Sequence, residues 1–218
     1  MILSRGRKYL FIHAPKTGGT SMALALEARA MKDDIMLGDR PKAVKRRKSL
    51  ADVRTAGRLW KHSTLADLDG LVARDEIDSL FIFTMVRKPW DRMVSYYHWL
   101  RAQSFDHPSV DLAKRLEFAA FVAEQLIAQS FSNTPVASYV TDALGVERSC
   151  HFIRLEHLAQ DLAPLEAHLV FTLDIPHVNS SVRTGDPRGA YDDESRARVA
   201  AYCAVDIARF GYCFESAA

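Results

Sequence analysis

The 218-residue chain has little cysteine, little surplus charge and no long hydrophobic run. Its three cysteines are too few for a disulfide framework and lack metal-ligand spacing, so we expect free thiols in a reducing compartment. The 29 basic residues nearly balance the 27 acidic ones, and a net charge of +2 argues against a general nucleic-acid coat. No apolar run approaches the roughly 20 residues of a membrane helix, and the run near the N-terminus is too short for a signal peptide. We therefore expect a cytoplasmic protein with no integral membrane segment and no nucleic-acid partner.

What the chain does contain is the composition of one folded domain, and we predict a single domain over residues 1–218. Hydrophobic residues make up 48% and charged residues 26%, which is typical of a soluble globular protein. Short apolar runs alternate with helix-forming stretches, which predicts an α/β fold, a three-layer sandwich around a central parallel sheet. The polar, basic stretch 32–58 has no clear periodicity and is expected to be a mobile insert. The predicted strands are 9–13, 59–61, 79–86 and 150–153, and the predicted helices are 22–27, 63–74, 91–101, 112–129, 137–143, 158–170 and 192–210.

A candidate anion site follows the first predicted strand, in the run Pro15-Lys16-Thr17-Gly18-Gly19-Thr20-Ser21. Two glycines permit a tight turn with exposed backbone amides, and the following helix directs its N–H groups and partial positive charge to the same point. Lys16 adds a full charge, and Thr20 and Ser21 add hydroxyl donors. The natural guest is a phosphate or a sulfate. The simpler interpretation, a helix N-cap after a glycine turn, leaves Lys16 unexplained.

This run is not a Walker A loop, because its lysine precedes the glycines and no Lys-Ser/Thr pair follows them. The usual Mg²⁺ and γ-phosphate apparatus is therefore not visible. A P-loop kinase remains the second hypothesis.

A second candidate site spans Val86 to Tyr97, in the run Val-Arg-Lys-Pro-Trp-Asp-Arg-Met-Val-Ser-Tyr-Tyr. Arg87 stands at the carboxyl end of the predicted strand, where open α/β sheets bind ligands. Ser95 lies two turns into the next helix and can face the same opening. The pair suits a second anionic group. The alternative is a surface arginine paired with Asp91 and a serine that faces solvent.

Together the two runs resemble motifs of the PAPS-dependent sulfotransferases, which transfer a sulfuryl group from 3′-phosphoadenosine 5′-phosphosulfate (PAPS) to a hydroxyl. Phe11–Ser21 is similar to that family's 5′-phosphosulfate loop, and Val86–Tyr97 is similar to its 3′-phosphate motif. The resemblance implies the P-loop-NTPase-like sulfotransferase fold. Softer matches to the carbohydrate branch, which contains heparan sulfate 2-O- and chondroitin sulfotransferases, lie at 152–158, 177–181 and 206–212.

The resemblance implies a role for each residue of the two motifs. Lys16 would stabilise the negative charge that grows on the departing phosphate. The 5′-phosphate would be held by Thr17, Gly18, Gly19, Thr20 and Ser21. The 3′-phosphate would be held by Arg87 and Ser95, and Arg183 would close over the cofactor. The product would be the 3′,5′-bisphosphate PAP, and no metal is implied.

An acceptor hydroxyl needs a base, and His62 is our choice among eight histidines. Related carbohydrate sulfotransferases place a catalytic histidine in this region. An imidazole with an ordinary pKa of about 6.5 suits the task near neutral pH. The plain alternative is a surface or structural histidine at this position, and His177 or a carboxylate is then the next candidate for the base.

The basic run Lys42, Lys45, Arg46, Arg47 and Lys48 has two interpretations. It is either a solvated loop or an electrostatic guide for an anionic acceptor. The chain is short for the animal glycosaminoglycan enzymes, which favours a hydroxylated acceptor such as a glycan, a glycolipid or a small metabolite. The hypotheses are thus a PAPS-dependent O-sulfotransferase acting on a saccharide, a small-molecule kinase, or a non-catalytic PAPS- or PAP-binding module.

Overall fold

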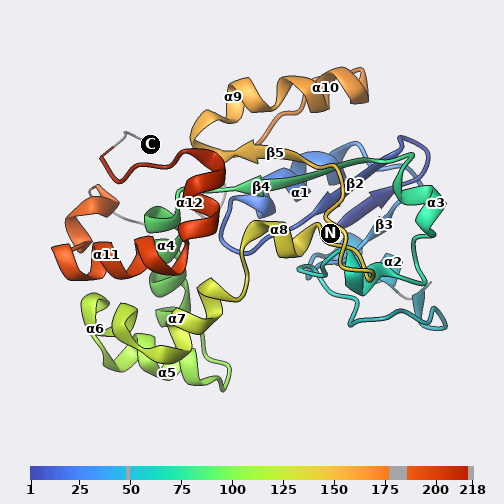
Figure 1. The fold of residues 1–218 in the computed structure, drawn as a ribbon. Coiled ribbons are helices and arrows are strands. Elements are labelled where there is room, and N and C mark those ends of the chain that lie inside the picture. The colour runs from blue at the N-terminus through green and yellow to red at the C-terminus, as the bar shows by residue number, and fades with distance from the viewer. Residues whose placement is uncertain (48–49, 177–185, 216–218) are drawn as a thin grey trace. The chain divides into compact units, whose positions relative to one another are not determined.

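The computed structural model describes residues 1–47, 50–176 and 186–215 (Figure 1). Backbone contacts divide the chain into two compact units. Unit 1 consists of Met1–Val86 and Val136–Val178, and unit 2 consists of Arg87–Pro135 and Asn179–Ala218. Each unit has a hydrophobic core of its own. A single domain over the whole chain stays a prediction.

Unit 1 is built on a five-stranded sheet whose order is β3-β1-β2-β4-β5. β2, β4 and β5 run parallel, whereas β1 is antiparallel to both β2 and β3. The predicted parallel sheet is therefore confirmed for the core and is wrong for the amino-terminal edge. β5 is an edge strand and not an inner one. The strands are β1 (Ile2–Ser4), β2 (Tyr9–Ile12), β3 (Ile35–Met36), β4 (Phe81–Val86) and β5 (His151–Arg154).

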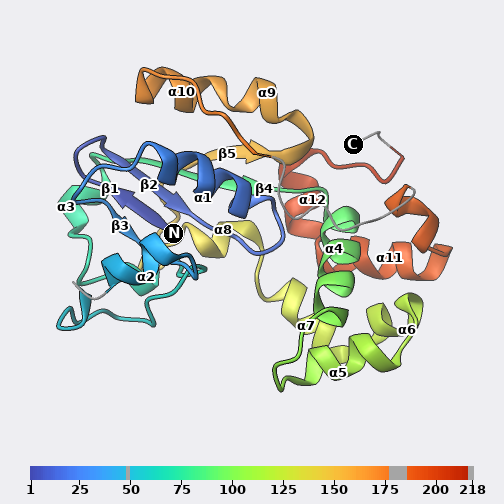
Figure 2. The ribbon, with the colours of Figure 1, turned by 180° about the vertical axis from the view of Figure 1, so that it is seen from behind.

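Helices cover both faces of this sheet, which confirms the predicted three-layer arrangement within unit 1 (Figures 1 and 2). β4 shows why. Phe83 and Met85 pack with α1 and α10, while Ile82 packs with η2, α3 and α8 on the opposite face. A strand buried on both faces must be apolar throughout, as β4 nearly is. The helices are α1 (Gly19–Ala28), α2 (Pro41–Arg47), η2 (Ala66–Leu68), α3 (Arg74–Ile77), α8 (Val136–Tyr139), η3 (Leu155–His157), α9 (Leu158–Asp161) and α10 (Ala163–Leu169).

The stretch between α1 and β4 differs most from its prediction. Part of the expected insert 32–58 forms β3 and α2. The strand expected at 59–61 is wrong, because Ser63 ties these residues into a turn. The helix expected at 63–74 is replaced by the single turn of η2 and a separate α3.

Unit 2 is helical, and its core gathers around the long helix α4. The helix expected at 91–101 is α4, and it begins two residues earlier because Pro89 occupies its first turn. The helix expected at 112–129 is divided among α5, α6 and α7, and the one expected at 192–210 breaks at Cys203. Among the described residues, no helix is long and apolar enough to cross a membrane. The helices are α4 (Pro89–Arg101), α5 (Pro108–Arg115), α6 (Phe118–Ala123), α7 (Gln125–Ser132), η4 (Pro187–Ala190), α11 (Asp193–Tyr202) and α12 (Ala204–Phe210).

Candidate functional site

The loop between β2 and α1 has two left-handed residues, Lys16 with φ +65° and Gly18 with φ +87°. A lysine rarely adopts this conformation, whereas glycine does so readily. The two left-handed positions let the chain turn from the end of β2 into α1, which begins at Gly19. The strand, glycine loop and helix predicted from the sequence are confirmed here.

The N-terminus of α1 is left open to an anion. None of the described side chains caps it, and its first turn contains no acidic residue. Within the described parts of the chain, the amides of Gly18, Gly19 and Thr20 have no hydrogen-bond acceptor. Free amides and the helix dipole favour a negative group at this point, and Lys16 lies in the same loop. These donors fit a phosphate or sulfate group.

The threonine and serine hydroxyls of this loop do not all remain available for such a ligand. Thr17 is buried, and its hydroxyl donates a 2.8 Å hydrogen bond to the carbonyl of Ala14. Thr17 therefore holds the loop together with its side chain. Thr20 and Ser21 lie half-buried in the first turn of α1.

Gly19 is required by a neighbouring side chain rather than by its own backbone angles. A Cβ at this position would lie 2.2 Å from Cδ2 and 2.5 Å from Nε2 of His13. The imidazole of His13 therefore packs directly on the start of α1. This contact explains one of the two loop glycines, and the left-handed φ explains the other.

His62 lies next to His13 and is held by it. Its Nδ1 is 2.7 Å from the backbone carbonyl of His13, and the two rings are 4.6 Å apart between centroids. A carbonyl can only accept, so Nδ1 carries the proton and the lone pair of neutral His62 is on Nε2. Burial lowers the pKa of His62 to about 4, against the opposing effect of this hydrogen bond. His62 is therefore neutral at physiological pH and presents a proton acceptor.

Five rings form a row from the core of unit 1 to its surface, in the order Phe83, Phe11, His13, His62 and Trp60. Successive centroids are 5.1, 5.7, 4.6 and 5.0 Å apart. The first three rings are buried, and the indole at the other end is 41% exposed. Burial also puts the pKa of His13 well below its ordinary value. The row fixes where the candidate base lies relative to the phosphate-type loop.

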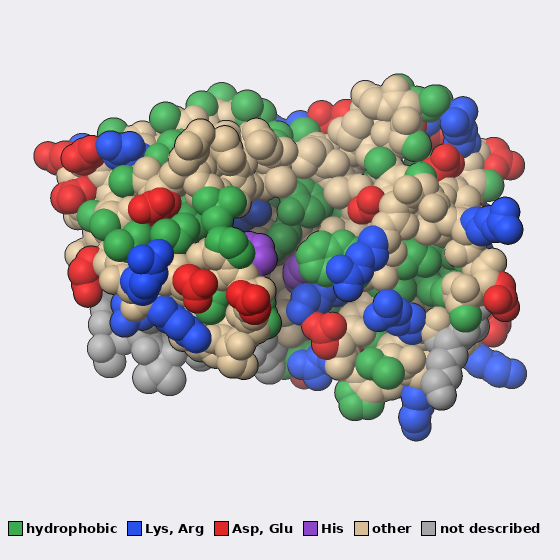
Figure 3. All heavy atoms as spheres, turned by 90° about the horizontal axis from the view of Figure 1, so that it is seen from below, with side chains coloured by type: hydrophobic (Ala, Val, Ile, Leu, Met, Phe, Trp, Pro, Cys, Tyr) green, Lys and Arg blue, Asp and Glu red, His purple; other side chains and the backbone are tan. Residues whose placement is uncertain are grey.

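The basic run predicted as a loop lies largely on α2. Two of its side chains are anchored, since Lys42 donates to the carbonyl of Glu27 and Arg46 donates to that of Asp34. Lys48 is outside the described residues. On the face drawn in Figure 3, basic side chains are interspersed with acidic ones.

Arg87 and Ser95 belong to unit 2, whereas Lys16 to Ser21 and His62 belong to unit 1. Ser95 is half-buried on α4, about 9 Å along the helix axis from Pro89. Its hydroxyl has no hydrogen-bond partner among the described residues. The structure thus groups the predicted residues into two sets. Arg183 and His177 lie outside the described residues.

Several residues that support this site were not predicted from the sequence. Ser63 organises the segment that carries His62, and Arg58 lies over the ring of Trp60. Trp60 was expected in a strand, although the four polar residues that follow it disfavour that assignment. At the end of β5, Arg154 makes a two-pronged ion pair with Asp161.

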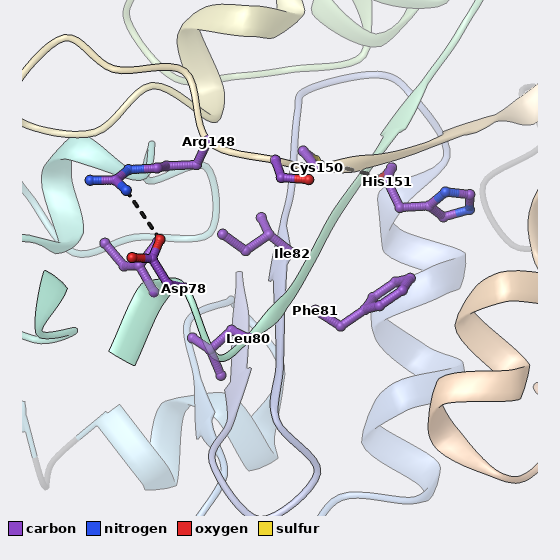
Figure 4. Close-up of a pocket in the computed structure, with 9 residues that line it drawn as sticks. Asp78, Leu80, Phe81, Ile82, Arg148, Cys150 and His151 are labelled. Atoms are coloured by element: carbon purple, nitrogen blue, oxygen red, sulfur yellow. Dashed lines mark hydrogen bonds and ion pairs between the residues drawn. The ribbon is translucent and has the colours of Figure 1, made fainter. Parts of the chain in front are cut away.

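A separate hollow of about 420 Å³ lies at the ends of the strands that are opposite to the phosphate-type loop (Figure 4). It opens beside the amino-terminal ends of β4 and β5, while the phosphate-type loop follows the carboxyl end of β2. Arg148 and Asp78 form an ion pair at its rim. The hollow is therefore distinct from the candidate site. It is lined by Ile77, Asp78, Leu80, Phe81, Ile82, Arg148, Ser149, Cys150 and His151.

In the described part of the chain, no group of three or more histidine, cysteine or acidic side chains is placed to hold a metal ion. The residues that the structure does bring together in unit 1 are an anion-binding loop and a neutral histidine. Such a pair can bind a phosphate or sulfate ester and remove a proton nearby.

No family model matches the chain, and no curated protein matches it in sequence. Among solved structures, the chain is similar to mouse sulfotransferase SULT7A1 complexed with PAP, with a TM-score of 0.44 and 17% sequence identity. The similarity covers 91% of this chain and 64% of that one. A likeness this distant permits no transfer of residue roles.

Proposed function

We propose that this protein is a PAPS-dependent O-sulfotransferase that acts on an acceptor hydroxyl, on a carbohydrate or a glycolipid. The observation that carries the proposal is the pairing, within unit 1, of an open anion-binding helix terminus with a neutral histidine. This histidine, His62, contacts the imidazole of His13, which packs on that helix terminus. PAPS would supply the sulfuryl group that is transferred.

The loop binds the 5′ end of the cofactor in this proposal. The amides of Gly18, Gly19 and Thr20 have no partner in the described chain and are free to donate to phosphate oxygens. Lys16 supplies a fixed positive charge where negative charge develops, and such preorganised charge lowers the barrier to transfer. The hydroxyl of Thr17 keeps the loop in shape.

His62 acts as the base. Its Nδ1–H is held by the carbonyl of His13, so Nε2 accepts the proton of the acceptor hydroxyl as that oxygen bonds to sulfur. A pKa of about 4 keeps the ring unprotonated and ready, although it also makes the ring a weak base. The surrounding rings prevent the imidazole from turning away.

The 3′-phosphate is assigned to Arg87 and Ser95 of unit 2. Arg87 follows directly after Val86, the last residue of β4, and a guanidinium pairs well with phosphate oxygens. The hydroxyl of Ser95, which has no hydrogen-bond partner among the described residues, supports the assignment. This contact distinguishes PAPS from common adenine nucleotides.

Two other functions compete with this one. A P-loop kinase would need a lysine after the glycines, which the loop does not have. A non-catalytic PAPS- or PAP-binding module would keep the loop but would need no oriented base. The neutral, tautomer-fixed His62 favours an enzyme over such a module.

The test is thermal stabilisation by PAP, with 5′-AMP and ATP/Mg²⁺ as controls. At a hundredfold excess over Kd, PAP should stabilise the protein by about 2.7 kcal/mol, a readily measured shift in Tm. A shift with ATP/Mg²⁺ and none with PAP would favour the kinase. Binding of PAP without transfer from PAPS to any acceptor would favour the binding module.

Lys16→Asn tests the role of the loop charge, because asparagine tolerates the left-handed backbone that Lys16 adopts. We expect a folded protein that has lost sulfuryl transfer. Lys8→Asn is the matched control, since Lys8 is exposed and also left-handed, with φ +53°, in the turn between β1 and β2. Equal activity in the two variants would remove Lys16 from the proposal.

A further inference from the structure

Trp60 is a large aromatic side chain left on the surface beside the candidate base. Its indole is 41% exposed and meets the ring of His62 edge-on, at 5.0 Å between centroids and an interplanar angle of 86°. An isolated exposed aromatic needs no explanation. This one lies at the outer end of the ring row, next to the ring of His62, the candidate base.

The segment that carries Trp60 is held in one conformation. Ser63 is fully buried, and its hydroxyl lies within hydrogen-bond distance of the carbonyls of Arg58 and Trp60. The amide of Trp60 donates to the same hydroxyl at 2.9 Å. The backbone from residue 58 to residue 63 is therefore closed around one side chain, and this presents the indole on a rigid support.

Arg58 provides a positive charge at the same place. Its guanidinium lies over the indole of Trp60, 5.8 Å from the ring centroid. Within the described residues, no carboxylate lies within ion-pair distance of Arg58. An arginine stacked on an aromatic ring keeps its N–H donors for an anion. The neighbouring Lys61, in contrast, is paired with Asp39.

We propose that Trp60 and Arg58 form the acceptor-binding surface and select a hydroxylated ring acid. The apolar face of the acceptor ring packs against the indole, and its carboxylate pairs with Arg58. The reacting hydroxyl then lies toward His62. This inference rests on the proposed sulfotransferase function, because it names the second substrate of the same site.

The acid can come from two sources, so the probes are two pairs in which one member carries a carboxylate and the other a neutral group. A preference for the sugar acid keeps the carbohydrate acceptor proposed above, and a preference for the aromatic hydroxy acid replaces it. Methyl β-D-glucuronide is compared with methyl β-D-glucoside, and 4-hydroxybenzoate with 4-hydroxybenzamide. Binding of each probe is measured by ligand-observed NMR in the presence of PAP. We expect the acid to bind at least about tenfold more tightly than its neutral partner in one pair, since a charge-assisted contact is worth this much.

Substitutions at the two exposed positions test the roles of Arg58 and Trp60. Arg58→Gln should reduce the preference for the acid to less than about twofold, and Trp60→Ala should weaken the acid and its neutral partner together. Arg54→Gln and Trp99→Ala are the matched controls, because Arg54 is exposed in the same segment and Trp99 is 37% exposed on α4. Both controls should bind the probes as the unmodified protein does.

The outcomes separate this inference from the proposed function. Thermal stabilisation by PAP should be the same in all four variants and in the unmodified protein. If PAP binds and neither acid is preferred, or if Arg58→Gln keeps the preference, the acceptor surface is wrong and the sulfotransferase proposal stands. If PAP fails to stabilise even the unmodified protein, the proposed function itself fails.

Discussion

Val170 ends helix α10 with a left-handed backbone, φ +61°, that a β-branched side chain rarely adopts. Its side chain is 88% exposed, so almost no buried apolar surface offsets this backbone strain. Val170→Gly should therefore raise the free energy of unfolding by about 1 kcal/mol, as measured by urea denaturation. Val205→Gly is the control, because Val205 is also exposed but lies within α12, where glycine should lower the stability. Equal effects at both sites would contradict the argument.

His13 and His62 couple stability to pH. Their folded pKa values lie below the ordinary 6.5, with His62 at about 4, and burial is the main cause in both. The unfolded chain therefore binds more protons between pH 4 and 6.5. The free energy of unfolding should fall as the pH is lowered through this window, by up to about 1.4 kcal/mol per pH unit for each imidazole.

His62→Gln should make this fall shallower, because it removes one of the two titrating rings. Urea denaturation between pH 7.5 and 4.5 measures the slope for each protein. Gln160→Ala, at an exposed position of α9 that carries no titrating group, is the control and should leave the slope unchanged. Parallel curves for His62→Gln and the unmodified protein would show that His62 is not buried as described.

For single residues, the sequence predicted the candidate binding and catalytic side chains, but not the contacts that hold these side chains in place. Lys16 and Gly18 follow from local turn chemistry, which depends on adjacent residues. The contact of His13 with Gly19 joins a strand end to a helix start across a loop, and no local pattern contains it. The tautomer of His62 depends on a carbonyl 49 residues away. Such distant partners are visible only in the folded chain.

The first residue of helix α1, Gly19, packs against the ring of His13 at the end of β2. Gly19→Ala would place a Cβ 2.2 Å from the ring of His13, which is itself packed between Phe11 and His62. We expect the variant to lose about 1–3 kcal/mol of stability by overpacking, measured by urea denaturation, and to bind PAP more weakly.

Two variants check the cause of this loss. Gly189→Ala is the control, since no atom of the described residues lies within 4 Å of a Cβ there, and it should be neutral. Adding His13→Ala to Gly19→Ala should recover part of the stability, because the smaller side chain removes the clash. If the double variant is simply the sum of the two single losses, the contact with His13 is not what requires glycine at this position.

Elements with strong local signals were predicted well, and short ones were not. β2 and β4 are continuous apolar runs, and their boundaries shifted by at most two residues. β1 and β3 have three and two residues, and they exist because each pairs with a neighbour in the sheet. The basic composition of α2 hid its helix, because its one buried residue, Ala43, leaves no apolar periodicity to detect.

For the whole molecule, the proposed function requires unit 1 and unit 2 to act on one cofactor. Arg87→Ala should weaken PAP about 10- to 100-fold, the value of a charge-assisted contact, and leave the affinity for 5′-AMP unchanged. Ser95→Ala should act in the same direction with a smaller loss. Calorimetric titration with both nucleotides measures this difference.

Arg115→Ala is the control, because Arg115 is exposed at the end of α5 in the same unit. It should bind PAP and 5′-AMP as the unmodified protein does. An equal loss of both nucleotides in Arg87→Ala would indicate damage to the structure instead of a lost 3′-phosphate contact.

The division of the chain also has a consequence for its biosynthesis. Unit 1 takes its residues from before position 87 and after position 135, with the first half of unit 2 made in between. As the ribosome releases the chain, β4 therefore emerges about 65 residues ahead of β5, the strand that covers its edge. Until then β4 offers an unpaired apolar edge, which is prone to association with other chains. A nascent chain that stalls before residue 150 therefore keeps this edge of β4 open to association.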